Sequence, residues 1–368
     1  MRSTFPQIQK PTLLVDKNKA LANLEKMSMK AAKAGLSYRP HFKTHQSIAV
    51  GEWHRAYDID KIAVSSVDMA DYFSGSWQDI LIAFPVNIRE IERIIRLAKK
   101  VTRLGLLVES PFTVNYLSEH LTNEVDIYIK IDTGYHRTGI DYTQQEDVEA
   151  TLMAIERGDK VRFAGFLVHA GHTYDVEGKS NVEVIHREAL DALGSLEQRY
   201  RSRFPHMVIS YGDTPSASLM DNFAPAAELR PGNLIYYDVM QMYIGACTWD
   251  QIAVCMACPI VSLHPERSEI VVYGGGVHFS KDVVERNGKK IFGLPVELTE
   301  SGWSAPPEGS YVRKLSQEHG VVKVPQSWVE TYQPGDLLGV LPIHSCLAVD
   351  CISDCYTMVG DRLDLFQP

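Results

Sequence analysis

Eight short apolar runs alternate with amphipathic helical segments over the first two thirds of the chain. The runs are Leu36–Phe42, Ile62–Val67, Ile80–Phe84, Leu104–Val108, Ile127–Ile131, Phe163–Val168, Met207–Ser210 and Leu229–Tyr236. Apolar residues recur with a helical period in the other segments, most clearly in Ala20–Ala34, Ile88–Lys99 and Val182–Leu196. This alternation predicts an α/β protein built on a (β/α)8 TIM-type barrel. An open doubly wound sheet is the alternative, but its first strand would be followed by a glycine-rich turn, which the sequence lacks.

The pattern changes after residue 245, where short alternating runs replace the helical period. These runs are Ile252–Val261, Glu269–Tyr273, Val321–Val324, Leu337–Leu341 and Ala348–Val359. We therefore expect a barrel over residues 17–245 and a mainly β domain over residues 246–368. The strand-like segment Pro11–Val15 is expected to pair with the second domain, which would then include residues 1–16.

Charge and hydropathy exclude several classes of protein. The net charge is −9 and Lys and Arg form no cluster, which argues against a nucleic-acid partner. No apolar run approaches the ~18 residues of a membrane-spanning helix, and the first residues do not resemble a signal peptide. We expect a cytoplasmic protein with no membrane partner.

The six cysteines all lie in the last third of the chain, and a chain of 368 residues is too long for a small disulfide-stapled domain. Cys255 and Cys258 could join Cys351 and Cys355 in a zinc site of four thiolates. The wider spacing of the second pair favours the alternative, in which these cysteines are small buried apolar residues.

Lys43 follows the first apolar run, with Arg39, His41 and His45 nearby. A lysine at the carboxyl end of a barrel strand projects toward the active-site face, where burial and neighbouring cations lower its pKa. A neutral amine is a nucleophile toward carbonyl carbons. We therefore expect Lys43 to be buried and to bond covalently to an aldehyde or ketone.

Polar, glycine-spaced clusters also follow four of the later runs, where a barrel places its active site. They are Asp132–Gly139, His169–Tyr174, Tyr211–Ser216 and Glu228–Asn233. Hydroxyls and backbone N–H groups after the last two strands suit a phosphate. The combination with Lys43 suits pyridoxal phosphate (PLP) or, as an alternative, a Schiff-base aldolase that acts on a phosphorylated sugar.

His344 and Cys346 form a second chemical feature. Two residues apart on an extended strand, they would point to the same face. Imidazole and thiolate together suit Zn2+.

These motifs together resemble the D-serine dehydratase/D-threonine aldolase family. The resemblance rests on Arg39-Pro40-His41-Phe42-Lys43-Thr44-His45 and on the order and spacing of the four clusters, and it extends from about Pro11 to Val349. Members of this family are fold-type III PLP enzymes, related to alanine racemase in having a barrel and a β domain.

The resemblance implies a role for each site residue. Lys43 would bond to PLP and take the substrate's Cα proton, Arg137 would lie near the phenolic oxygen, and Tyr174 would line the substrate side. His169 would lie against the cofactor ring and Arg230 would face the pyridine nitrogen. Thr214, Gly232 and Asn233 would hold the phosphate, and Gly212 would also contact the cofactor.

The family carries a His-x-Cys or His-x-Asp metal pair at the position of His344 and Cys346. The cysteine form resembles D-serine dehydratases, which use zinc, and the aspartate form resembles D-threonine aldolases, which use manganese-type ions. The resemblance thus implies a PLP- and Zn2+-dependent lyase that acts on D-β-hydroxy-amino acids, converting D-serine to pyruvate and ammonia, and that forms a homodimer.

Several alternatives stay open. The chain could be a D-threonine or 3-hydroxy-D-aspartate aldolase with Mn2+ or another divalent ion, an amino-acid racemase of the same fold, or a non-enzymatic PLP carrier. The segment Gly274–Asp282 either closes over the substrate or is a simple glycine-rich turn.

Overall fold

The computed structural model describes residue 5 and residues 7–367, so part of the predicted 1–16 segment and residue 368 lie outside the described residues. The chain divides into two compact units. The barrel unit comprises Glu25–Lys43 and Gly51–Gly232. Among the described residues, the sheet unit comprises residue 5, residues 7–24, Thr44–Val50 and Asn233–Gln367.

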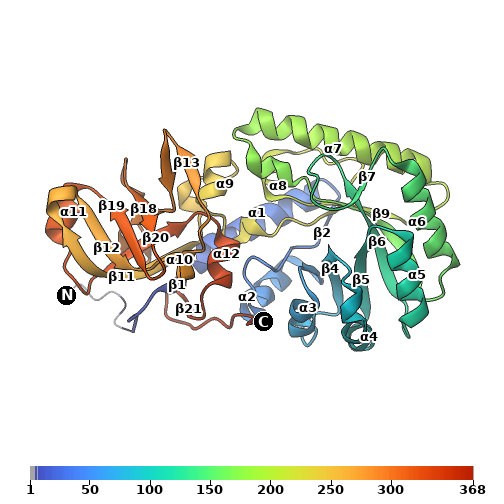
Figure 1. The fold of residues 1–368 in the computed structure, drawn as a ribbon, viewed down its shortest axis with the longest axis horizontal. Coiled ribbons are helices and arrows are strands. Elements are labelled where there is room, and N and C mark those ends of the chain that lie inside the picture. Colours follow the sequence, from blue (N-terminus) through green and yellow to red (C-terminus); the bar gives the residue numbers. More distant parts are fainter. Residues whose placement is uncertain (1–4, 6, 368) are drawn as a thin grey trace. The chain divides into compact units, whose positions relative to one another are not determined.

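The barrel unit is built on parallel strands in a single ring (Figure 1). Their spatial order is β2 (Ser37–Tyr38), β10 (Glu228–Leu229), β9 (Val208–Tyr211), β8 (Val161–Val168), β6 (Val125–Asp132), β5 (Arg103–Val108), β4 (Asp79–Pro85) and β3 (Lys61–Val64). A parallel bridge between His41 and Ala63 joins the two ends of this order and closes the ring. The short strand β7 (Ile140–Asp141) pairs with β6. The predicted (β/α)8 barrel is confirmed.

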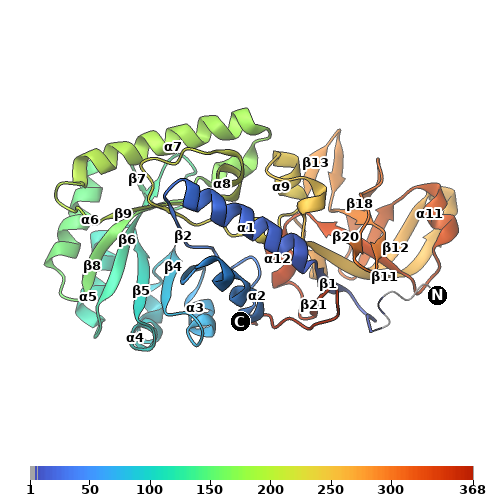
Figure 2. The ribbon, with the colours of Figure 1, turned by 180° about the vertical axis from the view of Figure 1, so that it is seen from behind.

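Helices follow the strands, as Figure 2 shows from the opposite side. They are α1 (Lys17–Lys33), α2 (Ile48–Trp53), α3 (Val67–Phe73), α4 (Ile91–Lys100), α5 (Pro111–His120), α6 (Gln145–Arg157), α7 (Lys179–Tyr200) and α8 (Thr214–Leu219). The next helix, α9 (Val239–Ile244), belongs to the sheet unit. In α4 the residues at helical spacing, Ile91, Ile94 and Leu97, are buried. The three helices predicted from periodicity all form, with ends that differ by a few residues.

Three barrel strands end earlier than predicted. The first ends at Tyr38, and the second ends at Val64, since Val67 already begins α3. The eighth ends at Leu229 although the apolar run continues to Tyr236. Pro231 has no N–H to donate to a neighbouring strand, and Asn233–Ile235 forms a 3-10 helix. The apolar character of this run reflects burial and not strand structure.

Charged side chains gather where the barrel strands begin. Arg39 Nε donates to Glu228 Oε2 at 3.0 Å, and Arg39 Nη1 donates to Asp79 Oδ1 at 2.6 Å. Lys61 Nζ lies 3.1 Å from the same oxygen of Glu228. Arg103 links Asp79 to Asp126. These ion pairs join β3, β4, β5, β6 and β10 around one end of the barrel.

The sheet unit is a mainly antiparallel sheet. Its order is β15 (Gly293–Val296), β20 (Leu337–Pro342), β11 (Val254–His264), β12 (Glu269–Tyr273), β19 (His319–Lys323) and β18 (Tyr311–Leu315). Two hairpins, β13–β14 (Val284–Arg286 and Lys289–Ile291) and β16–β17 (Leu298–Thr299 and Gly302–Trp303), and two helices, α10 (Gly276–Phe279) and α11 (Gln326–Thr331), accompany it.

The N-terminal strand β1 (Thr12–Val15) belongs to this sheet, as expected for the strand-like segment Pro11–Val15. It runs antiparallel to β11 and parallel to β21 (Cys355–Thr357). One earlier expectation for this unit is wrong. The run Ala348–Val359 is not a strand, because α12 (Ser345–Asp350) occupies its first part and only β21 is extended.

Among residue 5 and residues 7–367, no helix has the length and apolar character needed to cross a membrane.

Candidate active site

Lys43 lies in a turn just after the bridge between His41 and Ala63. Its side chain is exposed, so the expectation that Lys43 is buried is wrong. The turn carries it beyond the packed interior, whereas the preceding Phe42 is fully buried. Its ammonium still lies close enough to His169 to lower the pKa of that imidazole.

The turn after β6 is organised by Asp132. Its Oδ1 accepts hydrogen bonds from the backbone N–H groups of Gly134, Tyr135 and His136, at 2.9, 3.0 and 3.1 Å. The turn presents Arg137 with an exposed side chain, whose guanidinium carbon lies 5.0 Å from the centre of the Tyr135 ring. Arg137 therefore stands at the carboxyl end of β6, where the strand pattern predicted it.

His169 directly follows β8, and a hydrogen bond to the backbone of the turn after β9 holds its ring in place. The Nδ1–H donates to the carbonyl oxygen of Gly212 at 2.6 Å. Burial, followed by the charges of Lys43, Arg137 and Lys130, lowers the pKa of His169 well below its usual value. The imidazole is therefore neutral at pH 7 and presents a flat, uncharged ring.

The turn after β9 brings together three predicted site residues, Gly212, Thr214 and Tyr174. Thr214 is buried at the first position of α8, and its backbone N–H donates to the Tyr174 hydroxyl at 3.3 Å. Asp213 caps the same helix by accepting from Ser216 N–H at 2.7 Å, and burial raises the pKa of Asp213 to about 6. A side chain at Gly212 would press on Arg230, since a Cβ there would lie 3.2 Å from the guanidinium carbon.

Arg230 is buried and held from several sides within the barrel. Its Nε donates to Ser210 Oγ at 2.7 Å, and Nη2 donates to the carbonyl oxygens of Val168 and Ser210. The Ser210 hydroxyl in turn donates to Glu228 Oε1 at 2.7 Å. Burial lowers the pKa of Arg230 to about 10, so the guanidinium remains charged at pH 7.

Gly232 packs directly against the Lys43 segment. A Cβ at this position would lie 2.2 Å from the carbonyl oxygen of His41, so no side chain fits there. The two turns predicted to hold the cofactor, at His41–Lys43 and Arg230–Gly232, therefore touch through their backbones. His41 N–H also donates to the carbonyl oxygen of Pro231 at 3.4 Å.

Lys130, on β6, is a site candidate that the sequence analysis missed. It is 5% exposed, and its Nζ donates to the carbonyl oxygen of Ile131 at 2.8 Å. Burial, followed by the charge of Arg230, lowers its pKa to about 7. The only available signal was a lysine between two isoleucines in the interior of the strand.

His344 and Cys346 lie in the sheet unit, but not on a strand as expected. β20 ends at Pro342, His344 precedes α12, and Cys346 lies in the first turn of that helix. The two side chains nevertheless meet. Burial opposes a charge on His344, but hydrogen bonds to Asp282 and Cys346 raise its pKa to about 11.

Further polar contacts surround this pair. Cys346 Sγ lies 3.2 Å from Oγ1 of Thr44, the residue that follows Lys43 in the chain. Asp238 Oδ2 accepts from the backbone N–H of Ser345 at 2.9 Å and from Asn233 Nδ2 at 2.6 Å. The Asn233 side chain is thus hydrogen-bonded beside the His344–Cys346 pair, whereas the other predicted phosphate residues lie in the barrel unit.

The candidate residues of the barrel unit fit PLP, and those of the sheet unit fit a divalent metal ion. The barrel offers a primary amine, a neutral imidazole ring and a buried guanidinium, which match the aldehyde, ring and pyridine nitrogen of PLP. The sheet unit offers adjacent imidazole and thiol donors, and the buried Oδ1 of Asn233 has no hydrogen-bond partner among the described residues. Nitrogen, sulfur and amide oxygen are donors that a divalent ion can use.

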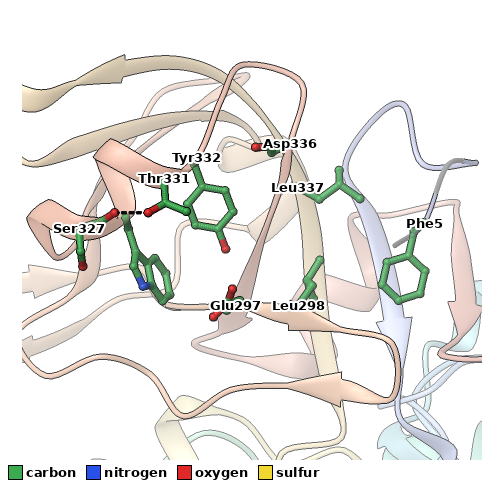
Figure 3. Close-up of a pocket in the computed structure, with 9 residues that line it drawn as sticks. Phe5, Glu297, Leu298, Ser327, Thr331, Tyr332, Asp336 and Leu337 are labelled. Carbon is green, nitrogen blue, oxygen red and sulfur yellow. Dashed lines mark hydrogen bonds between the residues drawn. The ribbon is translucent and has the colours of Figure 1, made fainter. Parts of the chain in front are cut away.

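A cavity of about 250 Å3 lies elsewhere in the sheet unit (Figure 3). Aromatic and acidic side chains line it, among them Trp328, Tyr332, Glu297 and Asp336. None of the site residues predicted from the sequence borders it.

Comparison with known families gives two matches. Residues 15–239 match the family described as "Alanine racemase, N-terminal domain", and residues 253–358 match a "Putative serine dehydratase domain". The first match covers more than half of the chain.

Individual relatives match along nearly the whole chain. D-serine dehydratase of Dictyostelium discoideum is 27% identical over 97% of this chain and 96% of its own. The structure of D-threo-3-hydroxyaspartate dehydratase from Delftia sp. HT23 is 20% identical, with a TM-score of 0.90 and 98% coverage of both chains. A cysteine-to-alanine mutant of that dehydratase, solved in a metal-free form, gives 21% identity and a TM-score of 0.89 with the same coverage.

Proposed function

Because this chain belongs to the D-serine dehydratase/D-threonine aldolase family of alanine racemase-like enzymes, we propose that it is a PLP- and Zn2+-dependent lyase. Its proposed reaction is the dehydration of D-serine to pyruvate and ammonia. The proposal rests most directly on the cysteine at position 346, since the metal pair of D-threonine aldolases has an aspartate there.

In this proposal, PLP bound in the barrel supplies an electron sink for the charge that develops at the substrate's Cα. Lys43 Nζ takes the Cα proton, and its exposure leaves the amine able to move between the cofactor and the substrate. His169 stays neutral, so it can lie against an aromatic ring without adding charge. Arg230 keeps its proton at pH 7 and donates to the ring nitrogen.

The phosphate is assigned to the turn after β9 and to Gly232. The buried Thr214 is the proposed donor, through its side-chain hydroxyl. The backbone N–H groups of Thr214 and Ser216 already bond to Tyr174 and Asp213. The close packing of Gly232 against the His41 carbonyl oxygen supports this assignment, because it holds the turn that contains Gly232 next to the turn that contains Lys43. Tyr174 already accepts a hydrogen bond from Thr214 and would line the substrate side.

His344 and Cys346 are proposed to hold Zn2+, which as a Lewis acid would make the β-hydroxyl a better leaving group. A cysteine-to-alanine mutant of D-threo-3-hydroxyaspartate dehydratase has been solved in a metal-free form, which agrees with a cysteine ligand in this family. With only two protein side chains assigned as ligands, coordination positions remain for water and for the substrate.

A product assay tests the proposal. Purified enzyme supplied with PLP and Zn2+ is expected to form equal amounts of pyruvate and ammonia from D-serine and neither product from L-serine. Lys43→Ala and Cys346→Ala are each expected to abolish the reaction. Glycine and an aldehyde from D-threonine, without pyruvate from D-serine, would instead identify an aldolase.

D-threo-3-hydroxyaspartate is a second candidate substrate, suggested by the D-threo-3-hydroxyaspartate dehydratase of Delftia sp., which is 24% identical over 94% of this chain. It would undergo the same elimination but yield oxaloacetate. The ratio of kcat/KM for the two substrates separates these candidates.

A further inference from the structure

We propose that Asp282 positions His344 for metal binding, and that the glycine turn Gly274–Gly276 serves to hold Asp282 in place. This inference rests on the metal site proposed above, and it gives a role to the segment Gly274–Asp282. Asp282 is a positioning residue here, since it acts through His344 and not on the substrate.

The contact that carries the inference is a short hydrogen bond. His344 Nδ1 lies 2.7 Å from Asp282 Oδ2, although the two residues are 62 positions apart. The side chains are 25% and 35% exposed, so solvent competes only in part for this bond. With Nδ1–H donating to the carboxylate, Nε2 is the ring atom left to bind a metal ion.

A carboxylate partner also changes the ligand itself. It holds the imidazole ring in one orientation and makes Nε2 more electron-rich, and losing such a partner typically weakens metal binding about 10–100-fold. The second ligand has its own support, because Thr44 Oγ1 lies 3.2 Å from Cys346 Sγ. Each member of the pair is therefore held by a side chain outside α12.

The glycine turn explains how Asp282 reaches this position. A Cβ at Gly274 would lie 2.6 Å from Cys258 Sγ, and a Cβ at Gly275 would lie 2.3 Å from the carbonyl oxygen of Gln317. Only glycines allow the chain to pass so close to β11 and to the loop before β19. This close passage fixes the start of α10, in which Phe279 is buried.

The residues after α10 then turn sharply. Ser280 has φ of +64°, which is uncommon for a residue with a side chain. Its hydroxyl accepts a hydrogen bond from the Asp282 N–H at 3.2 Å, which holds the turn in this conformation. The turn places Asp282 against His344. The segment Gly274–Asp282 therefore fixes the position of the Asp282 carboxylate.

Metal affinity tests the inference directly. The probe is Zn2+ added to protein stripped by a chelator, with affinity measured by competition against a chromophoric chelator. Asp282→Ala is expected to weaken Zn2+ binding 10–100-fold. Asp282→Asn should recover part of this loss, because its amide oxygen can still accept from Nδ1–H without supplying charge.

Glu285→Gln is the matched control. Glu285 lies three residues further along, on β13, and its side chain pairs with Lys290 at 3.8 Å on the surface. This change from acid to amide should leave Zn2+ affinity within twofold of the wild type. Circular dichroism and the thermal midpoint show whether each variant is folded.

A second measurement, by NMR, tests the hydrogen bond of the His344 imidazole. In the Zn2+-loaded protein labelled with 15N-histidine, the Nδ1 proton of His344 should give a downfield resonance protected from exchange. Asp282→Ala should lose this protection, because the acceptor of the Nδ1 proton is then absent, whereas Glu285→Gln should keep it.

The possible results separate this inference from the proposed function. Wild-type Zn2+ affinity in Asp282→Ala, together with a protected Nδ1 proton, would overturn the inference alone. If His344→Ala left Zn2+ binding unchanged, both the inference and the proposed metal site would be wrong. Zn2+ binding that depends on Asp282, in an enzyme inactive on D-serine, would support the inference and contradict only the proposed reaction.

Discussion

Lys130 illustrates how the barrel interior controls the charge of a side chain. A lysine with an ordinary pKa is fully charged at pH 7, but burial and the charge of Arg230 lower the pKa of Lys130 to about 7. Folding therefore removes a proton from this amine above pH 7. Burying this amine therefore lowers the free energy of unfolding. Such a loss of stability is common for residues in functional sites, and Lys130 lies beside the candidate cofactor residues.

Replacing this lysine should stabilise the fold and impair the enzyme. In the wild type, stability rises with pH between about 7 and 10.5, because the unfolded chain keeps the Lys130 proton that the folded chain has lost. Lys130→Met should therefore be more stable by about 1–2 kcal/mol at pH 7, with an advantage that shrinks toward pH 10.5. Urea unfolding of both proteins across this range is the measurement, and a pH-independent difference would contradict it.

Glu228 belongs to the ion pairs that join the beginnings of the strands. It is 2% exposed and contacts Arg39 and Lys61, while Ser210 links it to Arg230. Burial opposes its charge, but Arg39 and then Lys61 outweigh that effect and lower its pKa to about 2. Because the folded pKa is below the ordinary value of 4.5, its stabilising contribution is complete above pH 4.5 and is lost as pH falls toward 2.

Removing this carboxylate should destabilise the whole ring of strands. Glu228→Gln leaves the buried Arg39 with part of its charge unpaired, at an expected cost of about 3–5 kcal/mol at pH 7. The difference from the wild type should narrow as pH falls from 4.5 toward 2, because over this range the unfolded chain gains the Glu228 proton before the folded chain does. Guanidinium unfolding at pH 7 and pH 3 is the measurement, and equal differences at both pH values would be inconsistent with this account.

The turn after β10 has its own test in a matched pair of glycines. Gly232→Ala would place a Cβ 2.2 Å from the His41 carbonyl oxygen, so the turn must move and PLP should bind at least tenfold more weakly. Gly194, inside α7, has no atom within 4 Å of an added Cβ. Gly194→Ala should keep PLP affinity and gain up to about 1 kcal/mol of stability. Equal PLP affinity in both variants, from absorbance titrations, would remove the turn from the cofactor site.

In the sheet unit, strands from opposite ends of the chain are neighbours. β1 pairs with both β11 and β21, and its residues Leu13, Leu14 and Val15 are fully buried. A fragment of residues 246–368 would leave both partner strands with an open edge. We expect this fragment to be insoluble alone and to fold when residues 8–16 are fused to it through a flexible linker. Cooperative unfolding of the fragment without that segment would disprove this view.

The sequence was most informative where one local rule decides the structure. Alternating strands and helices predicted the barrel, and the rule that active sites lie at strand ends selected the clusters that contain Arg137, His169 and Thr214. The roles of these three residues come from the family resemblance and stay predictions. The expectation that an apolar run is a strand was wrong for most of the eighth run, which is apolar because it is buried and not because it is extended. The expectation of an extended strand was also wrong for His344 and Cys346, which lie at the start of a helix.

Other features depend on contacts that no local pattern carries. Asp282 reaches His344 across 62 positions, and nothing near either residue in the sequence indicates the other. Lys130 occupies an ordinary strand position, and its lowered pKa depends on burial and on Arg230, which follows β10, three strands along the ring from β6. Asn233 follows the barrel residues in sequence, yet its amide is bonded to Asp238 and Ser345 in the sheet unit.

The most direct test of the account is to identify the residue that carries PLP. Protein incubated with PLP is reduced with borohydride, digested and analysed by peptide mass spectrometry. The account predicts a single pyridoxyl modification on Lys43, and none on that peptide in Lys43→Arg. A modification confined to Lys130 or to surface lysines, or no modification at all, would contradict it.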